Sequence, residues 1–173
     1  MKTLLIGFTA GLTLGLSTPV FADDMHHGAG LMVKDAWSRV TTPGAKVGGG
    51  YLTLHNGGEM DDRLLSVSAP HAGKTEIHSM IMQDDVMIMR PVEEALTIEA
   101  GGMLSLEPGG LHLMFMQLEA PHVVGEPLTA VLTFQHAGDV EVEFEVLSMR
   151  DSMERSDHGA HGSHEHGSEA HGE

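Results

Sequence analysis

Histidine and methionine recur together in three short segments of this 173-residue chain, at residues 76–80, 87–91 and 109–116. A neutral imidazole is a borderline metal ligand and a thioether is a soft, uncharged one, so a mixed set favours Cu(I) over hard cations. Zinc would instead prefer thiolate or carboxylate ligands. Neutral donors also keep the total charge of the site at the +1 of the ion, which is less costly to hold near an apolar domain. These residue types therefore predict a Cu(I) site.

The spacing within each segment places the donors on one side of an extended strand. Side chains two residues apart share a face and lie about 6.6 Å apart along it, so His112 and Met114 point the same way. Leu111, Leu113 and Phe115 then face the core. The same spacing pairs the donors of the other two segments: His78 with Met80, and Met87 with Met89.

The alternative interpretation is structural, because a methionine pair on a strand more often fills a core than binds an ion. The conjunction of both residue types on three neighbouring expected strands favours binding. The other histidines of the central region have no such neighbours, and we expect them on the surface or in loops: His55, His71, His122 and His136.

Between about residues 31 and 149, apolar and polar residues alternate in short runs separated by Gly, Pro, Asp and Asn, which predicts strands. The clearest run is residues 140–146, where Val and Phe alternate with Glu. Short strands at intervals of about ten residues are typical of an all-β Greek-key sandwich or barrel. We expect strands over residues 33–40, 50–56, 63–69, 75–80, 86–90, 103–106, 111–118, 128–135 and 140–147.

The two ends of the chain differ from this central region. Residues 1–22 combine Lys2, an interrupted apolar stretch and small residues before the end, which predicts a signal peptide cleaved after Ala22 and a periplasmic location. The stretch is shorter than the ~20 residues that an uncleaved membrane anchor needs. We then expect a flexible segment over residues 23–30 and one domain over residues 31–150.

Residues 151–173, the His-rich tail, contain histidine among Gly, Ser, Ala and acidic residues, a composition typical of disorder. Closely spaced imidazoles could chelate a divalent metal such as Cu(II). An expression tag is the alternative, although tags are usually uniform histidine runs. The secondary metal candidates at the two ends are His26, His27, His158, His161, His164, His166 and His171.

Composition excludes several classes of function. The chain has no cysteine, so it has no thiolate nucleophile, no blue-copper Cys ligand and no Cys-based zinc site. Its formal net charge of −16 repels nucleic acid and attracts cations or basic protein surfaces. No set of Ser, His and Asp, no paired-carboxylate motif and no phosphate loop is recognisable, and we expect a non-enzyme.

The three segments resemble the periplasmic copper chaperones of the PCu(A)C family, whose pattern is His, ten residues, Met, twenty-one residues, His-x-Met. Here ten residues separate His78 from Met89, and His112-Leu113-Met114 supplies the last pair, but 22 residues separate Met89 from His112. We expect the surplus residue in the polar connection at residues 93–97. Flanking segments, including residues 51–54 and 108–111, also resemble the family.

The resemblance implies a cupredoxin-like β-barrel with an exposed Cu(I) site. It implies His78, Met89, His112 and Met114 as the ligands, with Met80 and Met116 as possible alternates. It also implies delivery of copper to a copper centre of cytochrome c oxidase, through an oxidase subunit or its assembly factor.

We therefore expect a periplasmic chaperone that binds Cu(I) through two His and two Met, with the His-rich tail recruiting Cu(II). One rival is a periplasmic copper or zinc buffering or resistance protein, which would bind several ions without directed transfer. Electron transfer is the other rival, and the missing Cys ligand argues against it.

Overall fold

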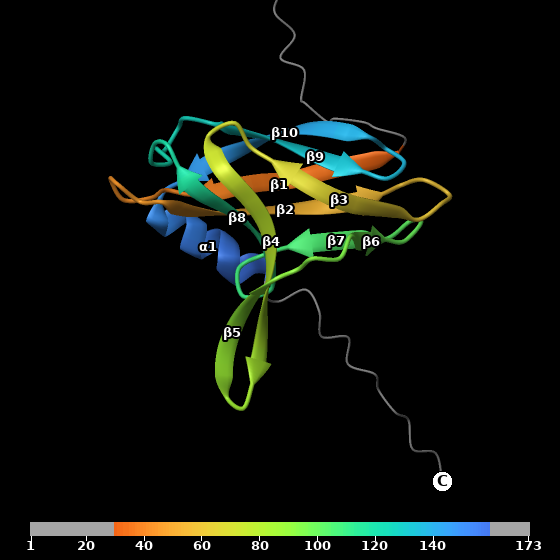
Figure 1. The fold of residues 1–173 in the computed structure, drawn as a ribbon, viewed down its shortest axis with the longest axis horizontal. Coiled ribbons are helices and arrows are strands. Elements are labelled where there is room, and N and C mark those ends of the chain that lie inside the picture. Colours follow the sequence, from red (N-terminus) through yellow and green to blue (C-terminus); the bar gives the residue numbers. More distant parts are fainter. Residues whose placement is uncertain (1–29, 160–173) are drawn as a thin grey trace, which may run out of the picture.

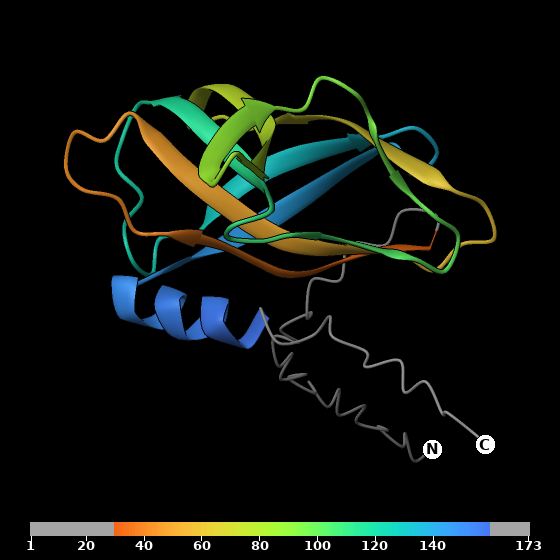
Figure 2. The same ribbon diagram turned by 90° about the horizontal axis from the view of Figure 1, so that it is seen from below.

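The computed structural model describes residues 30–159, which form a body of strands with one helix along its side (Figures 1 and 2). Alternating apolar residues of the strands meet inside this body, as expected for an all-β domain. The elements in chain order are β1 (Leu31–Arg39), β2 (Val47–Asn56), β3 (Asp62–Ser68), β4 (Ala72–Gln83), β5 (Val86–Pro91), β6 (Leu96–Ile98), β7 (Met103–Leu106), β8 (Leu111–Leu118), β9 (Leu128–Phe134), β10 (Asp139–Leu147) and α1 (Met149–Gly159).

The strands form a continuous hydrogen-bonded path in the order β5-β4-β8-β2-β1-β10-β9-β3-β6, with β7 paired to β2 beside it. The β1–β10 pair is parallel, and the other pairs are antiparallel. The path begins at β5 and ends at β6, so the strands enclose a core without closing into a complete barrel. The all-β prediction is confirmed. Of the two predicted alternatives, a sandwich or a barrel, the closed barrel is not what the structure has.

The core is built by strict alternation on the central strands. On β10, Val140, Val142, Phe144 and Val146 are buried while the acidic residues between them are exposed, as the pattern predicts. On β8, the predicted inward face is confirmed, because Leu113 and Phe115 are fully buried and Leu111 packs against the core. Burying one face of β8 leaves the other face, which carries His112 and Met114, pointing outwards.

Every strand expected from the sequence is present, although β2 and β4 are longer than expected. The short strand β6 was not predicted. Its three residues give too little alternation to detect, and it forms by pairing with β3. Residues 96 and 97, which we expected in a connection, therefore belong to a strand, and only residues 92–95 connect β5 to β6.

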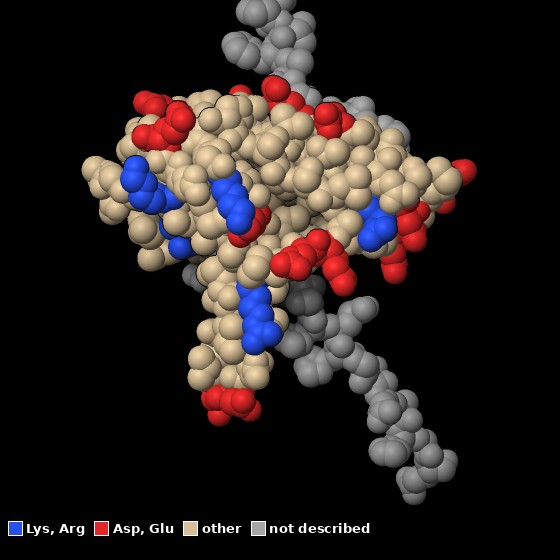
Figure 3. All heavy atoms as spheres, viewed as in Figure 1, with Lys and Arg blue, Asp and Glu red and all other residues tan. Residues whose placement is uncertain are grey.

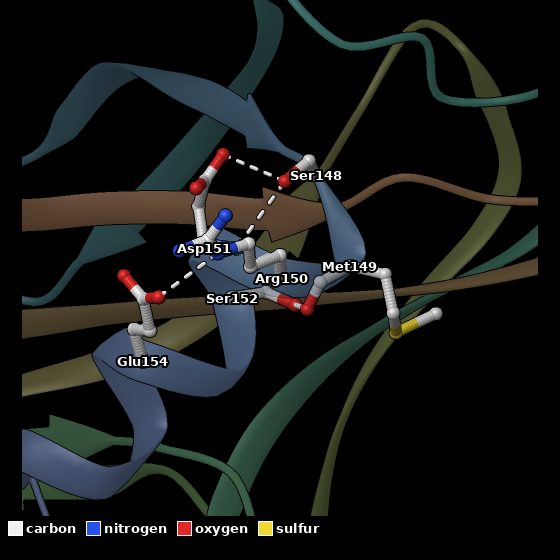
Figure 4. A network of polar contacts seen from close by, with 6 residues as sticks. All are labelled: Ser148, Met149, Arg150, Asp151, Ser152 and Glu154. Atoms are coloured by element: carbon white, nitrogen blue, oxygen red, sulfur yellow. Dashed lines mark hydrogen bonds and ion pairs between the residues drawn. The ribbon is translucent and has the colours of Figure 1, made fainter.

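The prediction that the chain loses structure from residue 151 is wrong, because α1 continues to Gly159. Ser148 caps this helix: its hydroxyl accepts from the Asp151 amide at 3.2 Å and donates to the Asp151 carboxylate at 2.6 Å (Figure 4). One helical turn later, Ser152 is fully buried and its hydroxyl accepts a hydrogen bond from Arg39 of β1 at 3.0 Å. The cap and this contact hold a polar segment in a helix.

Several predictions concern residues that the structure does not describe. The signal peptide, the segment at residues 23–29, His26, His27 and the four last histidines of the tail lie outside the described residues. His158 lies in the last turn of α1. Within residues 30–159, no helix has the length and apolar character needed to cross a membrane.

Candidate metal centre

The three segments that carry histidine and methionine become three adjacent strands, because β4 pairs with β5 on one side and with β8 on the other. The register places His78 of β4 directly opposite His112 of β8. Two residues towards the hairpin tip, Met80 of β4 lies opposite Met89 of β5. Two residues the other way, Glu76 of β4 lies opposite Met114 of β8. Directly paired residues share a face, so all four predicted ligands lie on the outer face of the sheet.

A recess of about 330 Å³ opens on this face at the base of the β4–β5 hairpin. Its lining includes Met80, Met89, His112 and Met114, together with Arg39 of β1 and residues of β2 and of the β7–β8 turn. His78 lies beside this recess, with its ring centroid 6.1 Å from that of His112. With metal–nitrogen bonds of about 2.0 Å, two rings that share an ion have centroids roughly 5 to 6 Å apart. The observed separation is at the upper end of that range.

His112 is held in a fixed orientation. The residue is only 5% exposed, and its Nδ1 lies 3.1 Å from the carbonyl oxygen of Gly110. Because a carbonyl can only accept, Nδ1 carries the proton and Nε2 keeps its lone pair. A backbone carbonyl on the second nitrogen is the usual way in which a ligating imidazole is oriented. Nε2 is therefore the nitrogen of His112 available to a metal ion.

His78 is oriented by a carboxylate. Its Nε2 lies 2.9 Å from Oε2 of Glu76, and Glu76 also forms an ion pair with Lys74. The hydrogen bond from Lys74, and after it the one from His78, holds the pKa of Glu76 below its ordinary value, so Glu76 is a carboxylate and accepts from Nε2. A neutral His78 then has its lone pair on Nδ1, which is buried and has no hydrogen-bond partner among residues 30–159. An unpartnered buried acceptor is costly, and a metal ion would satisfy it.

The methionines differ in their solvent exposure and in their position relative to the recess. Met89 is 44% exposed at the recess rim, whereas Met80 and Met114 are half-buried. Met116, the other alternate, lies opposite Lys74 and Val47 and does not line the recess. The structure thus brings Met80 together with the predicted ligands and leaves Met116 apart. A thioether partly open to solvent is accessible to an incoming ligand, which suits exchange of a bound ion.

His122, which we expected at the surface or in a loop, does lie in a loop but is not at the surface. This residue is in the β8–β9 loop, but it is only 1% exposed, and its Nδ1 is 2.8 Å from the hydroxyl of Ser38. Its ring occupies space left by Gly48, where a Cβ would come within 2.4 Å of the ring. Burial, and next the neighbouring His71, lowers the pKa of His122 to about 4.

The other three histidines outside the centre differ in environment. The ring of His71 lies 5.3 Å from that of His122, and burial lowers the pKa of His71 as well. His55 is half-buried on strand β2, so the expectation of a surface or loop position is wrong for this residue. His136 is exposed in the β9–β10 loop, as expected. None of the three lines the recess. No sequence pattern marks His122 as buried, because its loop has no periodicity.

Comparison with known proteins places residues 31–146 in the family described as "Putative lipoprotein LpqE-like". One curated relative is "Putative lipoprotein Lxx21020" of Leifsonia xyli subsp. xyli, which is 27% identical over 105 residues. That alignment covers 61% of this chain and 62% of the relative, so the match spans less than two thirds of the relative's length.

Solved structures share the fold. The apo PCuAC domain from PmoF1 matches with a TM-score of 0.61 and 23% identity, covering 71% of this chain and 98% of that domain. The copper-bound PCuAC domain from PmoF2 matches with a TM-score of 0.60 and 19% identity, covering 71% and 97%. The Cu(I) form of DR1885 from Deinococcus radiodurans matches with a TM-score of 0.53 and 25% identity, covering 72% and 82%.

Proposed function

This chain belongs to the LpqE-like family and has the PCuAC fold, and from that premise we propose that it binds one Cu(I) ion and passes it to another protein. The observation that carries the proposal is the arrangement of donors around one recess. Two oriented imidazoles and the thioethers of Met80, Met89 and Met114 lie on three paired strands. The copper-bound PCuAC domain from PmoF2 and the Cu(I) form of DR1885 support the choice of metal.

The chemistry of binding follows from neutral donors. His78 Nδ1, His112 Nε2 and the sulfurs of Met89 and Met114 would coordinate Cu(I) without an anionic bond, with Met80 as an additional or exchanging donor. An acceptor with thiolates is softer and anionic, so transfer to it is downhill. Each step exchanges one ligand for another, and copper remains Cu(I) throughout. The proposal involves no catalysed reaction.

We place this transfer in the periplasm, since residues 1–22 have the pattern of a signal peptide and the family name fits an exported protein. The proposed receiver is a copper centre of cytochrome c oxidase, reached through an oxidase subunit or its assembly factor. That receiver rests on the resemblance to PCu(A)C chaperones. Mixing the Cu(I)-loaded protein with the isolated copper-binding oxidase domain tests it by the movement of copper between them.

X-ray absorption on the protein loaded with one equivalent of Cu(I) tests the ligand set. We expect two nitrogen scatterers and at least two sulfur scatterers, because the recess offers both imidazoles and thioethers. The same measurement on a chain ending at residue 159 is the control, and it should give an unchanged spectrum. A first shell of nitrogen alone would place the copper on the His-rich tail and refute the proposed centre.

Glu76 should act as a positioning residue for His78. We expect Glu76→Ala to weaken Cu(I) binding by about 10- to 100-fold, the usual effect of removing a carboxylate that orients a ligating imidazole. Glu76→Gln should restore part of the loss, because its amide oxygen can still accept from Nε2. Competition with a chromophoric Cu(I) chelator measures the affinity. Glu141→Gln, an exposed position on β10, is the control, and equal affinities for all variants would contradict the assignment.

The His-rich tail has a separate proposed role, the recruitment of Cu(II). Since α1 extends to Gly159, the informative deletion removes residues 160–173 and leaves the helix intact. We expect the number of Cu(II) ions bound to fall while the Cu(I) affinity stays within about twofold, because imidazole clusters chelate divalent metal. Titration with each oxidation state measures both. Parallel loss of Cu(I) and Cu(II) binding would contradict separate sites.

A further inference from the structure

The β4–β5 hairpin extends beyond the body of the protein, and β5 is the end strand of the hydrogen-bonded path (Figure 1). The two strands are joined by Asp84 and Asp85, both with positive φ, as a tight two-residue hairpin turn requires. The projecting part contacts no other strand of the described fold through the sheet ladder. Its side chains are therefore not selected by packing in the core.

One face of this hairpin carries only methionine beyond the His78 position. Met82 lies directly opposite Met87, two residues further towards the tip than the Met80–Met89 pair. The opposite face carries Ile81 paired with Ile88 and Arg90 bonded to Gln83. The two faces of one hairpin thus separate soft donors from purely aliphatic and polar groups.

Met82 and Met87 are 64% and 45% exposed, so neither sulfur fills a cavity. Directly opposed side chains on paired strands have Cβ atoms about 5 Å apart, close enough for two flexible thioethers to contact one ion. The next donors, on Met80 and Met89, lie about 6.6 Å along the strands. The carboxylates of Asp84 and Asp85 stand at the tip, where they attract cations (Figure 3).

We propose that Met82 and Met87 form a second, weak Cu(I) site through which the ion enters and leaves the recess. This inference rests on the proposed function, and it adds a route to it. Copper bound to the outer pair gains the thioethers of Met80 and Met89 as it loses those of Met82 and Met87. It then gains His78, His112 and Met114, and Met80 can leave. The ion stays Cu(I) and no electron moves. Each outer thioether that leaves is replaced by an inner one, and the number of donors then rises from two to four as the ligands of the recess bind.

Two neutral sulfurs hold Cu(I) less tightly than the four mixed donors of the recess. Losing the outer pair should therefore change the rate of copper transfer more than the affinity of the protein for Cu(I). We expect the double variant Met82→Leu/Met87→Leu to keep one tight Cu(I) site with an affinity within about twofold, because leucine preserves volume and apolar character. The rate of copper transfer from the loaded protein to a bulky Cu(I) chelator should fall about tenfold. Ile81→Leu/Ile88→Leu on the opposite face is the matched control, with an unchanged rate.

Methionine methyl NMR during a Cu(I) titration separates the two sites. The first equivalent should shift the methyl signals of Met89 and Met114, and further Cu(I) should then shift those of Met82 and Met87 in fast exchange. Outer signals that remain fixed in excess Cu(I), or an unchanged transfer rate in the Met82/Met87 variant, overturn the second site alone. Failure of Met89 and Met114 to shift at the first equivalent refutes the proposed function itself.

Discussion

Replacing Met114 with leucine should lower the Cu(I) affinity by more than about 100-fold while leaving the fold intact. Loss of a residue that only orients a ligand costs about 10- to 100-fold, and loss of a ligand itself should exceed that. Met114 is half-buried on the outer face of β8 and lines the recess, and leucine fills nearly the same volume there. Competition against a Cu(I) chelator of known affinity measures the change.

Met116→Leu is the matched control for this prediction. Met116 is on the same strand and the same face as Met114, but it lies outside the recess. Its replacement should leave the affinity within about twofold, since no proposed ligand is removed. Equal weakening by both variants would mean that the ion sits further along β8 than we propose, and no weakening by Met114→Leu would remove the thioether from the ligand set.

The sequence predicted the strands of the site well, because their inner faces obey a period of two. Fully buried Leu113 and Phe115 alternate with His112 and Met114, so the direction of the donors follows from the direction of the core residues. What the pattern could not provide is which strands are neighbours. The pairing of β4 with β8 joins residues that are more than thirty positions apart. The conjunction of His and Met on three expected strands favoured a shared site, but only the family resemblance specified His78, Met89, His112 and Met114 as its ligands.

The positioning residues were missed for a related reason. The sequence does not single out Glu76 within residues 76–80, because its hydrogen bond to His78 depends on both side chains projecting from one face of β4. The helix α1 did leave a signal, the Ser148-x-x-Asp151 capping pattern, which the polar composition after residue 150 obscured. Short capping motifs are weak predictors of a helix on their own. Tertiary contacts, such as the hydrogen bond between Ser152 and Arg39, decide whether the helix forms.

The structure also explains why one additional residue between Met89 and His112 is compatible with the ligand arrangement. The intervening chain leaves β5, pairs with β3 through β6, returns to β2 through β7, and then enters β8. Met89 is positioned by the β4–β5 register and His112 by the β4–β8 register. Neither register depends on the length of the connection. An insertion in a loop of this path changes the loop and leaves the donors in place.

Acidification from pH 7 to pH 4 should remove about 3 kcal/mol of stability from the copper-free protein through His122 alone. Its pKa is lowered to about 4 in the folded state, against about 6.5 in an unfolded chain. Between these values the unfolded state binds more protons, so stability falls as the pH falls through this window. At about 1.36 kcal/mol for each pKa unit, the difference gives the stated loss, and His71 adds to it in the same direction.

The physical cause lies in the surroundings of His122, where the described part of the chain places no acid to stabilise an imidazolium. Ser38 donates its single proton to the carbonyl of Gly49 at 2.8 Å, so its oxygen must accept from Nδ1 of His122. Its Nε2 is buried and has no hydrogen-bond partner within the described residues, and the rings of His71 and Phe115 pack against the imidazole ring. Urea unfolding at pH 7, 5.5 and 4 measures the effect. His122→Gln should reduce the loss of unfolding free energy between pH 7 and pH 4 by about 3 kcal/mol relative to the parent. His136→Gln, at an exposed position, is the control and should leave the pH dependence unchanged. Parallel pH profiles for the parent and His122→Gln would show that a different group is responsible.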